Sequence, residues 1–325
     1  MRTTVDILTG FLGSGKTTLL NRLLADGAFA DTAVVVNELG EIGLDHLLVS
    51  ERTENVALLE GGCLCCAVVD SLPETLLDLC RGRASGNLPP FRRVVIETTG
   101  LADPGPILRV LNSSPLLSHF FEVGVVIVTI EPCDLKKRLD RHPEARRQLA
   151  LADRIVLTKT DVDGPFSDEA MAILQAANPL AEILKAEEIA SDPARLMRPA
   201  RRSADDNYKH YAGPAGHTHA VRAFSLPVEG EVTRAGIAAL AKVLGKKIGE
   251  RLLRCKGIVK GAKGPLLVQS VGPSLLSEPL PVIPGGLQYH LTFIAENCEE
   301  EDFSSCLHWL FIPEGSQPPV QEEIE

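Results

Sequence analysis

The chain has 325 residues, 45% of them hydrophobic, and a formal net charge of −10 at pH 7. This length allows two domains whose cores need no disulfides. The negative charge repels phosphate backbones and anionic lipid headgroups, so we expect neither nucleic acid nor a membrane as a partner.

Short runs rich in Val and Ile alternate with helix-like stretches through the first 200 residues. The predicted strands are 5–9, 32–38, 56–60, 93–99, 123–130 and 154–158. The predicted helices are 15–26, 71–81, 104–111, 143–152 and 167–177. Continuous apolar strands are typical of sheets buried on both faces, and strand–helix alternation is typical of parallel sheets. The pattern therefore predicts an α/β fold with a mostly parallel, doubly wound sheet.

A polar stretch rich in Pro and Arg, residues 191–219, interrupts this alternation and is typical of an exposed linker. The elements predicted beyond it are a strand at 220–226, a helical region at 231–253, short strands around 255–270 and 288–295, and a helix near 302–310. They indicate a second, smaller α/β domain, followed by an acidic end that we expect to be disordered. The expected division is 1–200 for a P-loop domain, 201–218 for a linker, 219–313 for the second domain and 314–325 for the tail.

The segment GFLGSGKT, which begins at Gly10, fits the pattern G-x-x-x-x-G-K-[ST] between a predicted strand and a predicted helix. Gly10, Gly13 and Gly15 let the backbone curl so that successive N–H groups face phosphate oxygens, and the helix N-terminus adds positive potential. Lys16 supplies a mobile charge for the β- and γ-phosphates, and Thr17 supplies a hydroxyl for Mg²⁺. The alternative is an ordinary Gly-rich turn that caps a helix.

The tetrapeptide TKTD follows another predicted strand, at the edge where an open α/β sheet binds its ligand. In a guanine-reading loop of the form N/T-K-x-D, the carboxylate of the Asp, here Asp161, accepts two hydrogen bonds from the guanine edge, and the Lys stem lies along the base. Adenine has no donors there, so a buried Asp161 would stay unpaired at a cost of about 1 to 3 kcal/mol. The loop favours GTP over ATP, and the alternative is a common Lys/Asp turn after a strand.

Two further segments have the composition of nucleotide switches. NELGEIGLDH follows the second predicted strand and carries Glu38 and Glu41 among glycines, with a solvated acidic loop as the alternative. ETTGLADPGP ends another buried strand, where Glu97 is placed to hold a Mg²⁺-bound water and Gly100 to present its N–H to the γ-phosphate. The alternative for Glu97 is an incidental acid at a strand end.

Cys63, Cys65 and Cys66 form the motif GGCLCC after the third predicted strand, on the same rim as the P-loop. Because no export signal or membrane-spanning apolar run is apparent, we expect a cytoplasmic protein whose thiols stay reduced. Thiolates suit Zn²⁺ and other borderline metals, but three of them leave a closed site incomplete. The alternatives are buried core cysteines and a thiol redox pair. Candidates for a fourth ligand are Glu38, Glu41, His217, His219, water and a target protein.

The other cysteines are isolated in apolar or mixed stretches, where we expect them to pack in the core. They are Cys80, Cys133, Cys255, Cys298 and Cys306. His217 and His219 lie in the polar linker, where solvation is expected rather than metal binding.

In their order along the chain, GFLGSGKTT, VNELGEIGLD, GGCLCC, ETTGLADPGPI and ADRIVLTKTDV resemble the motifs of the CobW/YjiA-like family of P-loop GTPases. Members are proposed metallochaperones, related to the nickel-insertion GTPases of hydrogenase and urease. The second domain resembles the C-terminal domain of that family more loosely, through LLRCKGIV and LTFIAE.

This resemblance implies a set of site residues. GTP would bind Gly10, Gly13, Ser14, Gly15, Lys16, Thr17, Thr18, Thr158, Lys159 and Asp161. Mg²⁺ would bind Thr17, with Glu97 as a Walker B-type acid, and the transferred metal would bind Cys63, Cys65 and Cys66. Thr158 stands where many GTPases have Asn, which leaves one contact between this loop and the nucleotide site open.

The resulting hypothesis is a GTP-hydrolysing metallochaperone with Lys16, Glu97 and Gly100 as catalytic residues. It would bind Zn²⁺, or Co²⁺ or Ni²⁺, at the cysteine motif and transfer the metal to a client metalloprotein under the control of GTP. No arginine finger or catalytic glutamine is apparent, so we expect slow hydrolysis that a partner or a homodimer accelerates. The alternatives are a P-loop small-molecule kinase and a non-catalytic metal buffer or thiol sensor.

Overall fold

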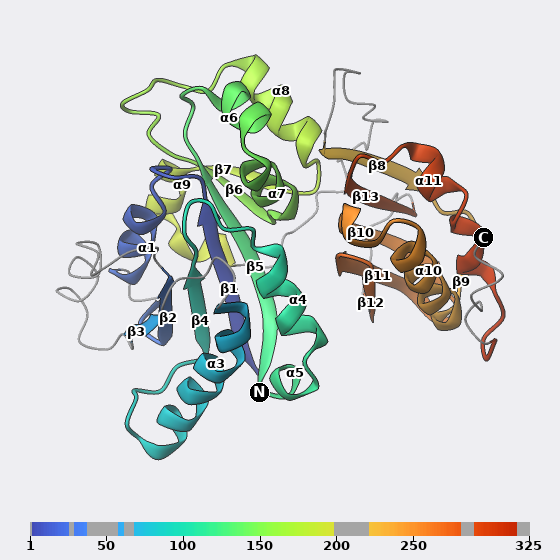
Figure 1. Cartoon of the computed structure of the whole chain (residues 1–325), viewed down its shortest axis with the longest axis horizontal. Helices are drawn as coiled ribbons and strands as arrows, with labels where there is room; N and C mark the ends of the chain where they lie inside the picture. Colours follow the sequence, from blue (N-terminus) through green and yellow to red (C-terminus); the bar gives the residue numbers. More distant parts are fainter. Residues whose placement is uncertain are drawn as a thin grey trace. The chain divides into compact units, whose positions relative to one another are not determined.

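The computed structural model describes residues 2–25, 29–37, 58–61, 68–197, 221–280 and 289–316. The chain divides into two compact units (Figure 1). The first comprises Met1–Ala172 and Ala181–Ala200, and the second comprises Ile173–Leu180 and Arg201–Glu325. The domain boundaries expected from the sequence stay a prediction. Within the described ranges, no helix is both long and apolar enough to cross a bilayer.

The first unit is built on a parallel sheet, which confirms the predicted fold class. In the described part of the chain this sheet has seven strands in the order β3-β2-β4-β1-β5-β6-β7. The strands are β1 Thr3–Gly10, β2 Thr32–Asn37, β3 Leu58–Gly61, β4 Arg93–Glu97, β5 Phe121–Ile130, β6 Arg154–Leu157 and β7 Glu182–Lys185. Strand β7 is short and half-exposed, and its run of four residues was not predicted from the sequence.

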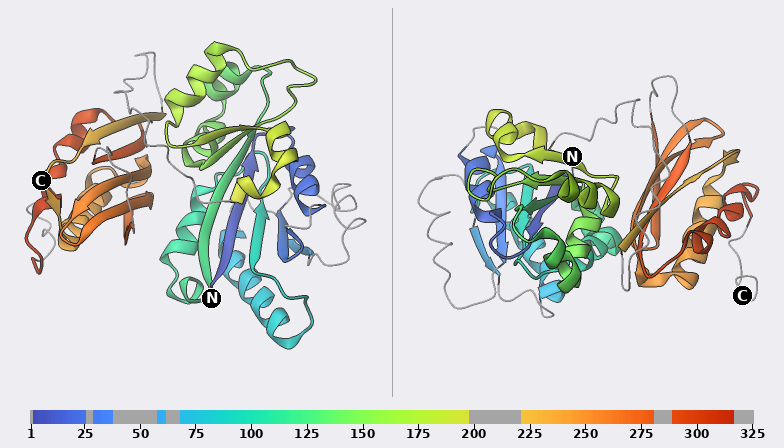
Figure 2. Two further views of the ribbon diagram at one scale, coloured as in Figure 1. Left: turned by 180° about the vertical axis from the view of Figure 1, so that it is seen from behind. Right: turned by 90° about the horizontal axis from the view of Figure 1, so that it is seen from above.

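Helices cover both faces of this sheet (Figures 1 and 2). Their bounds are α1 Lys16–Leu24, α3 Val68–Ser85, α4 Gly105–Ser113, α5 Pro115–Phe120, α6 Leu135–Arg141, α7 Pro143–Leu151 and α9 Ala186–Ser191. Helix α8, Asp168–Ala177, contains the division between the two units, which falls after Ala172. On one face, α1 and α9 bury leucines and isoleucines against Leu8, Val34 and Ile127. Helices α4 and α7 pack on β5 from the other side.

In this sheet β1 lies between β4 and β5. Strands β2, β3 and β4 are on one side of it and β5, β6 and β7 are on the other, so the strand order switches at β1. Strand β4 pairs with β1 on one side, with Leu8 opposite Glu97. Strand β5 pairs on the other side, with Gly10 opposite Thr129. Open α/β sheets bind ligands at such a switch in strand order, outside the carboxyl ends of the strands. The loop after Gly10 therefore lies where this architecture forms a site.

The second unit contains a mostly antiparallel sheet with helices, as predicted for a smaller α/β domain. Its strand order is β12-β11-β10-β13-β8 with β9 beside β10, which makes six strands among the described residues. The bounds are β8 Val221–Pro227, β9 Glu231–Val232, β10 Leu252–Gly261, β11 Gly264–Val271, β12 Ser274–Pro279 and β13 His290–Glu296. Helix α10 spans Arg234–Lys247, and α11 spans Glu300–Ser304 before a 3-10 helix at Leu307–Phe311.

One element of this unit differs from its prediction. The region 231–253 was expected to be helical throughout, but the helix begins only at Arg234, where the Thr233 hydroxyl accepts a hydrogen bond from the Gly236 N–H at 2.8 Å. It ends at Lys247, and Leu252 already pairs with Ala295 of β13. Strand pairing thus overrides the helical propensity of the last residues, because it buries their side chains in the sheet.

The core of the second unit centres on aromatic side chains. The Phe293 and Phe303 rings stack with their centroids 4.7 Å apart, and Phe224 lies 5.4 Å from Phe303. Helix α10 adds Leu240 and Leu244, both fully buried, to the same cluster. Aromatic pairs of this kind stabilise a fold by about 0.5 to 1.5 kcal/mol beyond their area burial.

Candidate nucleotide-binding site

The loop between β1 and α1 has the backbone of a phosphate cradle. Gly13 and Gly15 adopt positive φ angles of 73° and 89°, and Gly15 is the left-handed residue that precedes the first turn of α1. This curvature turns successive N–H groups to the same side, and the helix N-terminus adds its positive potential. The predicted strand–loop–helix arrangement is present.

Gly10 is held too closely by its neighbours to carry a side chain. A Cβ atom at this position would lie 2.5 Å from the Thr129 carbonyl oxygen and 2.7 Å from Ser14 Oγ. The Ser14 and Thr129 hydroxyls are 2.7 Å apart and buried, so they hydrogen-bond the loop to the end of β5. Thr129 therefore anchors the cradle, a role that no sequence motif indicated.

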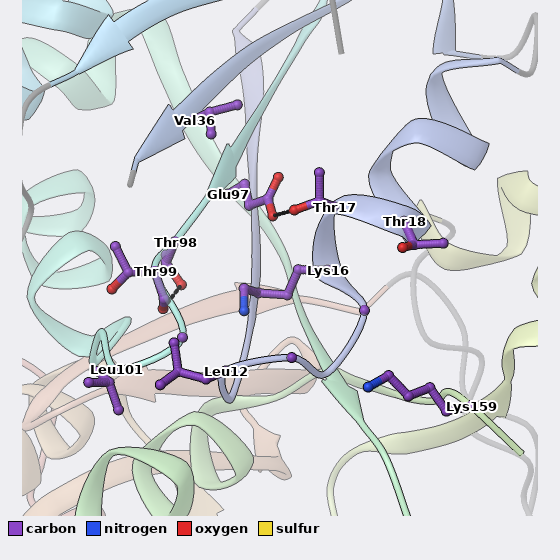
Figure 3. A pocket seen from close by; sticks show the side chains of 13 residues that line it. Leu12, Lys16, Thr17, Thr18, Val36, Glu97, Thr98, Thr99, Leu101 and Lys159 are labelled. Atoms are coloured by element: carbon purple, nitrogen blue, oxygen red, sulfur yellow. Dashed lines mark hydrogen bonds between the residues drawn. The ribbon is translucent and has the colours of Figure 1, made fainter. Parts of the chain in front are cut away.

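Lys16 is folded into the loop that precedes it. Its Nζ donates to the carbonyl oxygens of Gly10 at 3.0 Å and Phe11 at 3.1 Å. The residue is only 9% exposed, and its side chain lies along the inner side of the loop (Figure 3). The ammonium group thus lies on the loop side of the pocket, where a phosphate chain would need a positive charge.

Thr17 and Glu97 come together across the first turn of α1 and the end of β4. Thr17 Oγ1 donates to Glu97 Oε1 at 2.6 Å (Figure 3). Glu97 is 4% exposed. A hydroxyl and a carboxylate are oxygen donors that suit Mg²⁺, which takes few protein ligands and completes its shell with phosphates and water. The donor set fits the predicted magnesium site, and the role of these two residues in binding stays a prediction.

The segment after β4 forms a turn against the cradle. The Ala102 N–H donates to Thr99 O at 3.2 Å, which closes the turn over Gly100 and Leu101. A Cβ atom on Gly100 would lie 2.5 Å from the Leu12 backbone nitrogen. Gly100, the residue predicted to contact the γ-phosphate, is thus packed directly on the P-loop.

TKTD begins where β6 ends, and its first residue contacts the P-loop. Thr158 Oγ1 lies 2.8 Å from Ser14 O and 3.1 Å from Ile130 O, and as a donor it links the two loops. The resemblance left open one contact between TKTD and the nucleotide site, because Thr158 stands in place of Asn. The threonine hydroxyl makes a contact to the P-loop at this position. Lys159 has a left-handed backbone with φ 55°, and Asp161 is exposed on the turn that follows.

Lys159 is held by an acid that sequence reasoning missed. Its Nζ lies 2.7 Å from Glu131 Oε2, and Arg138 Nη2 lies 2.7 Å from Glu131 Oε1. Glu131 follows β5 directly, and its side chain is only 13% exposed. The sequence shows Glu131 only as a single acidic residue after an apolar strand. Its distance along the chain from Lys159 gives no indication that the two side chains pair.

These elements line one pocket of about 470 Å³. Its walls are Leu12, Gly13, Gly15, Lys16, Thr17, Thr18, Val36, Glu97, Thr98, Thr99, Gly100, Leu101 and Lys159 (Figure 3). Within the described residues, the pocket thus joins the P-loop, the magnesium candidates, the Gly100 turn and the lysine of TKTD.

Several predicted ligands lie outside the described residues. They are Glu38, Glu41, Cys63, Cys65, Cys66, His217 and His219. In the ranges that the structure covers, no group of three or more His, Cys, Asp or Glu side chains is arranged to hold a metal ion.

The isolated cysteines were expected to pack in the core, which holds for three of them. Cys255, Cys298 and Cys306 are buried, and burial raises the pKa of the Cys255 and Cys298 thiols, which keeps both protonated. Cys80 is half-buried, and the pKa of its thiol is also raised by burial. The expectation is wrong for Cys133, which is exposed on the loop after β5.

Thr158→Val should weaken nucleotide binding, because it removes the hydroxyl that joins TKTD to Ser14 and leaves a buried carbonyl with one partner fewer. We expect a loss of about 1 kcal/mol, close to fivefold in Kd for GTP. Thr158→Ser keeps the hydroxyl and should bind nearly as the parent does. Fluorescent-nucleotide titration of the three proteins measures the difference, and equal affinities of the Val variant and the parent would contradict the assigned contact.

Comparison with known proteins agrees with this geometry. The model of the CobW/HypB/UreG nucleotide-binding domain matches residues 4–185. The zinc chaperone YjiA of Escherichia coli (strain K12) is 41% identical over 160 residues, which cover 49% of this chain and 50% of YjiA. The zinc chaperone CobW of Pseudomonas aeruginosa is 29% identical over 308 residues, which cover 82% of this chain and 80% of that protein.

The aligned part of the chain spans about half the length of the first curated relatives it matches. Among solved structures, the Zn(II)-bound YjiA GTPase from E. coli superposes with a TM-score of 0.70 at 24% identity, covering 96% of this chain and 100% of that one, which shows a common fold. The family model covers more than half of the 325 residues. The chain therefore belongs to the CobW/HypB/UreG family of nucleotide-binding domains.

Proposed function

We propose that this protein is a GTP-hydrolysing metallochaperone that binds a divalent metal through Cys63, Cys65 and Cys66 and transfers it to a client metalloprotein under the control of GTP. Zinc is the preferred metal because the two relatives described above are named zinc chaperones. Cobalt and nickel are the alternative metals, since thiolates also bind them.

The observation that carries the nucleotide part is the common pocket of Lys16, Thr17, Glu97 and Gly100. Lys16 and the N–H groups of the glycine loop would hold the β- and γ-phosphates. Thr17 and Glu97 would hold Mg²⁺, which supplies neutralisation of the charge that develops on the phosphate oxygens. The Gly100 N–H would recognise the terminal phosphate, the group that distinguishes GTP from GDP.

Guanine selection would come from the TKTD turn. Thr158 ties this turn to the P-loop, and Glu131 orients Lys159 at the rim of the pocket. The Asp161 carboxylate would accept the two donors on the guanine edge, which adenine lacks. A base bound there would lie at the end of the pocket that Lys159 lines.

The register of the sheet supports a link between the nucleotide and the cysteine motif. Gly61, the last residue of β3, pairs with Asn37 of β2, and Val36 pairs with Glu97 of β4. Neighbouring strands lie about 4.8 Å apart, so the end of β3 is on the order of 10 Å from the backbone of Glu97. Cys63 is two residues beyond Gly61 in the sequence, and we propose that the motif binds its metal within reach of the magnesium site. Coupling of this kind typically changes metal affinity by roughly 5- to 150-fold.

Intrinsic hydrolysis would be slow. Among the described residues that line the pocket there is no arginine and no glutamine, the side chains that stabilise or orient the reacting groups in faster GTPases. A client or a second copy of the chain would supply the missing group.

Phosphate release from GTP and from ATP, each with Mg²⁺, tests the enzymatic part. We expect turnover of GTP on the order of 10⁻² s⁻¹ or slower, and none of ATP at the same concentration. Turnover of ATP with phosphoryl transfer to a small acceptor would favour a P-loop kinase instead. Metal binding without hydrolysis of either nucleotide would indicate a metal buffer or thiol sensor.

A further inference from the structure

The side-chain amide of Gln148, on α7, is buried and donates hydrogen bonds to the turn at residues 99–102, which follows β4. The residue is 1% exposed. Its Nε2 donates to Gly100 O at 3.2 Å and to Ala102 O at 2.9 Å. A buried amide is costly to desolvate, and both bonds are made to the peptide groups of the turn that lines the pocket. Gln148 itself does not line the pocket.

The turn also packs against the P-loop. The space at Gly100 is closed by the Leu12 backbone, whose nitrogen would lie 2.5 Å and whose Cα would lie 2.7 Å from a Cβ atom there. Because both the P-loop and Gln148 contact it, the turn has little freedom to shift relative to the phosphate cradle. The Arg147 guanidinium adds a half-exposed ion pair with Asp103 at 3.1 Å, at the base of the same segment.

The hydrogen bonds of the turn also determine where the Gly100 N–H points. Thr99 O accepts from the Ala102 N–H inside the turn. The described peptide bonds include no cis bond, so the N–H of Gly100 points away from Thr99 O and out of the turn. Gly100 is one of the residues that line the pocket. The carbonyl of the same residue is the group that Gln148 binds.

We infer that Gln148 is a positioning residue for the terminal phosphate: by binding the Gly100 and Ala102 carbonyl oxygens it fixes the turn, and with it the Gly100 N–H, and so determines the preference for GTP over GDP and the rate of hydrolysis. The inference rests on the proposed GTPase function. GDP lacks the phosphate that the Gly100 N–H would contact, so affinity for GDP should depend little on Gln148. Its removal should therefore act on the GTP state and on kcat.

Gln148→Met tests this, because methionine has a similar length and no hydrogen-bond donor. We expect Kd for a non-hydrolysable GTP analogue to rise roughly tenfold, kcat to fall by roughly tenfold or more, and Kd for GDP to stay within about twofold of the parent. Hydrogen–deuterium exchange in the peptide that contains residues 98–104 should accelerate.

A second variant guards against a folding defect. Gln148→Glu keeps the shape of the side chain but places a carboxylate against two carbonyl oxygens, and it should show the same selective loss. A protonated carboxyl group donates one hydrogen bond, so kcat of this variant should recover in part as the pH is lowered, relative to the parent. A general folding defect would instead weaken the binding of GTP and of GDP together.

Ala145→Gly is the matched control. It weakens the same helix, but a side chain of this size cannot hydrogen-bond the turn, so the ratio of GTP to GDP affinity should stay at the parent value. The inference is overturned if the parent prefers the GTP analogue and both Gln148 variants show an unchanged ratio and unchanged kcat. If the parent neither hydrolyses GTP nor binds it, the proposed function itself fails.

Discussion

Lys16→Ala is expected to lower kcat/KM for GTP by roughly 100-fold or more, because it removes the positive charge that faces the β- and γ-phosphates. In the structure this ammonium lies inside the loop, within 3.1 Å of two of its carbonyl oxygens, and the residue is largely buried. No other lysine is placed inside the glycine loop among the described residues that line the pocket. The measurement is steady-state phosphate release over a range of GTP concentrations.

Lys136→Ala is a control for the change in net charge. Lys136 is 71% exposed and makes only a 3.8 Å surface ion pair with Glu169. Exposed pairs of this kind contribute at most about 1 kcal/mol, so the control should hydrolyse GTP as the parent does. A Lys16→Ala protein with parental kcat/KM would show that the P-loop does not bind the nucleotide phosphates.

Asp161→Asn is expected to change which base the protein accepts. A carboxylate accepts the N1 and N2 donors of guanine, whereas an amide presents one donor and one acceptor and so matches xanthine, which has a carbonyl at C2. Asp161 is exposed, so water can satisfy its side chain when the base does not match, and we expect the ratio of GTP to XTP affinity to fall by roughly 10- to 100-fold. Competition of GTP, XTP and ATP against a fluorescent nucleotide measures the ratio.

Asp163→Asn offers the same chemical change two residues along the exposed turn. Asp163 is outside the N/T-K-x-D pattern, so its variant should keep the preference for GTP. If the Asp161 and Asp163 variants bind GTP equally well, TKTD is an ordinary turn after a strand and the nucleotide is selected elsewhere.

The central strands and the P-loop could be predicted because their signals are local. Strands β4 and β5 contain runs of Val and Ile, β1 contains Val5, Ile7 and Leu8, and most of the residues in these strands are buried. A motif of fixed spacing follows β1. Strand β7 and the helices α5, α6 and α9 are too short for a periodic pattern, with 4 to 7 residues each. For the region 231–253 the sequence predicted too long a helix. Its local sequence favours a helix, but its last residues pair with the distant strand β13.

The candidate site also contains some residues that could be predicted from the sequence and others that could not. Thr17 and Glu97 could be paired in advance, because parallel strands end at one edge and the chemistry of Mg²⁺ selects these side chains. Thr129 and Gln148 could not, since their contacts join residues 115 and 48 positions apart and no spacing encodes them. The one sequence signal for Gln148 is its place with Ala145 and Leu149 on the inward face of α7, where an uncharged polar side chain needs a buried partner.

Metal binding in two nucleotide states tests the central claim most directly. The full chain is titrated with Zn²⁺ against a competing chelator, with Mg²⁺ and either GDP or a non-hydrolysable GTP analogue, alongside a Cys65→Ala, Cys66→Ala variant and a Cys133→Ala control that lacks an exposed thiol outside the motif. We predict that the GTP analogue changes the affinity of the parent and of the control by roughly 5- to 150-fold relative to GDP, and that the double variant loses this difference. Equal zinc affinity of the parent with GDP and with the GTP analogue would contradict control of the metal site by the nucleotide.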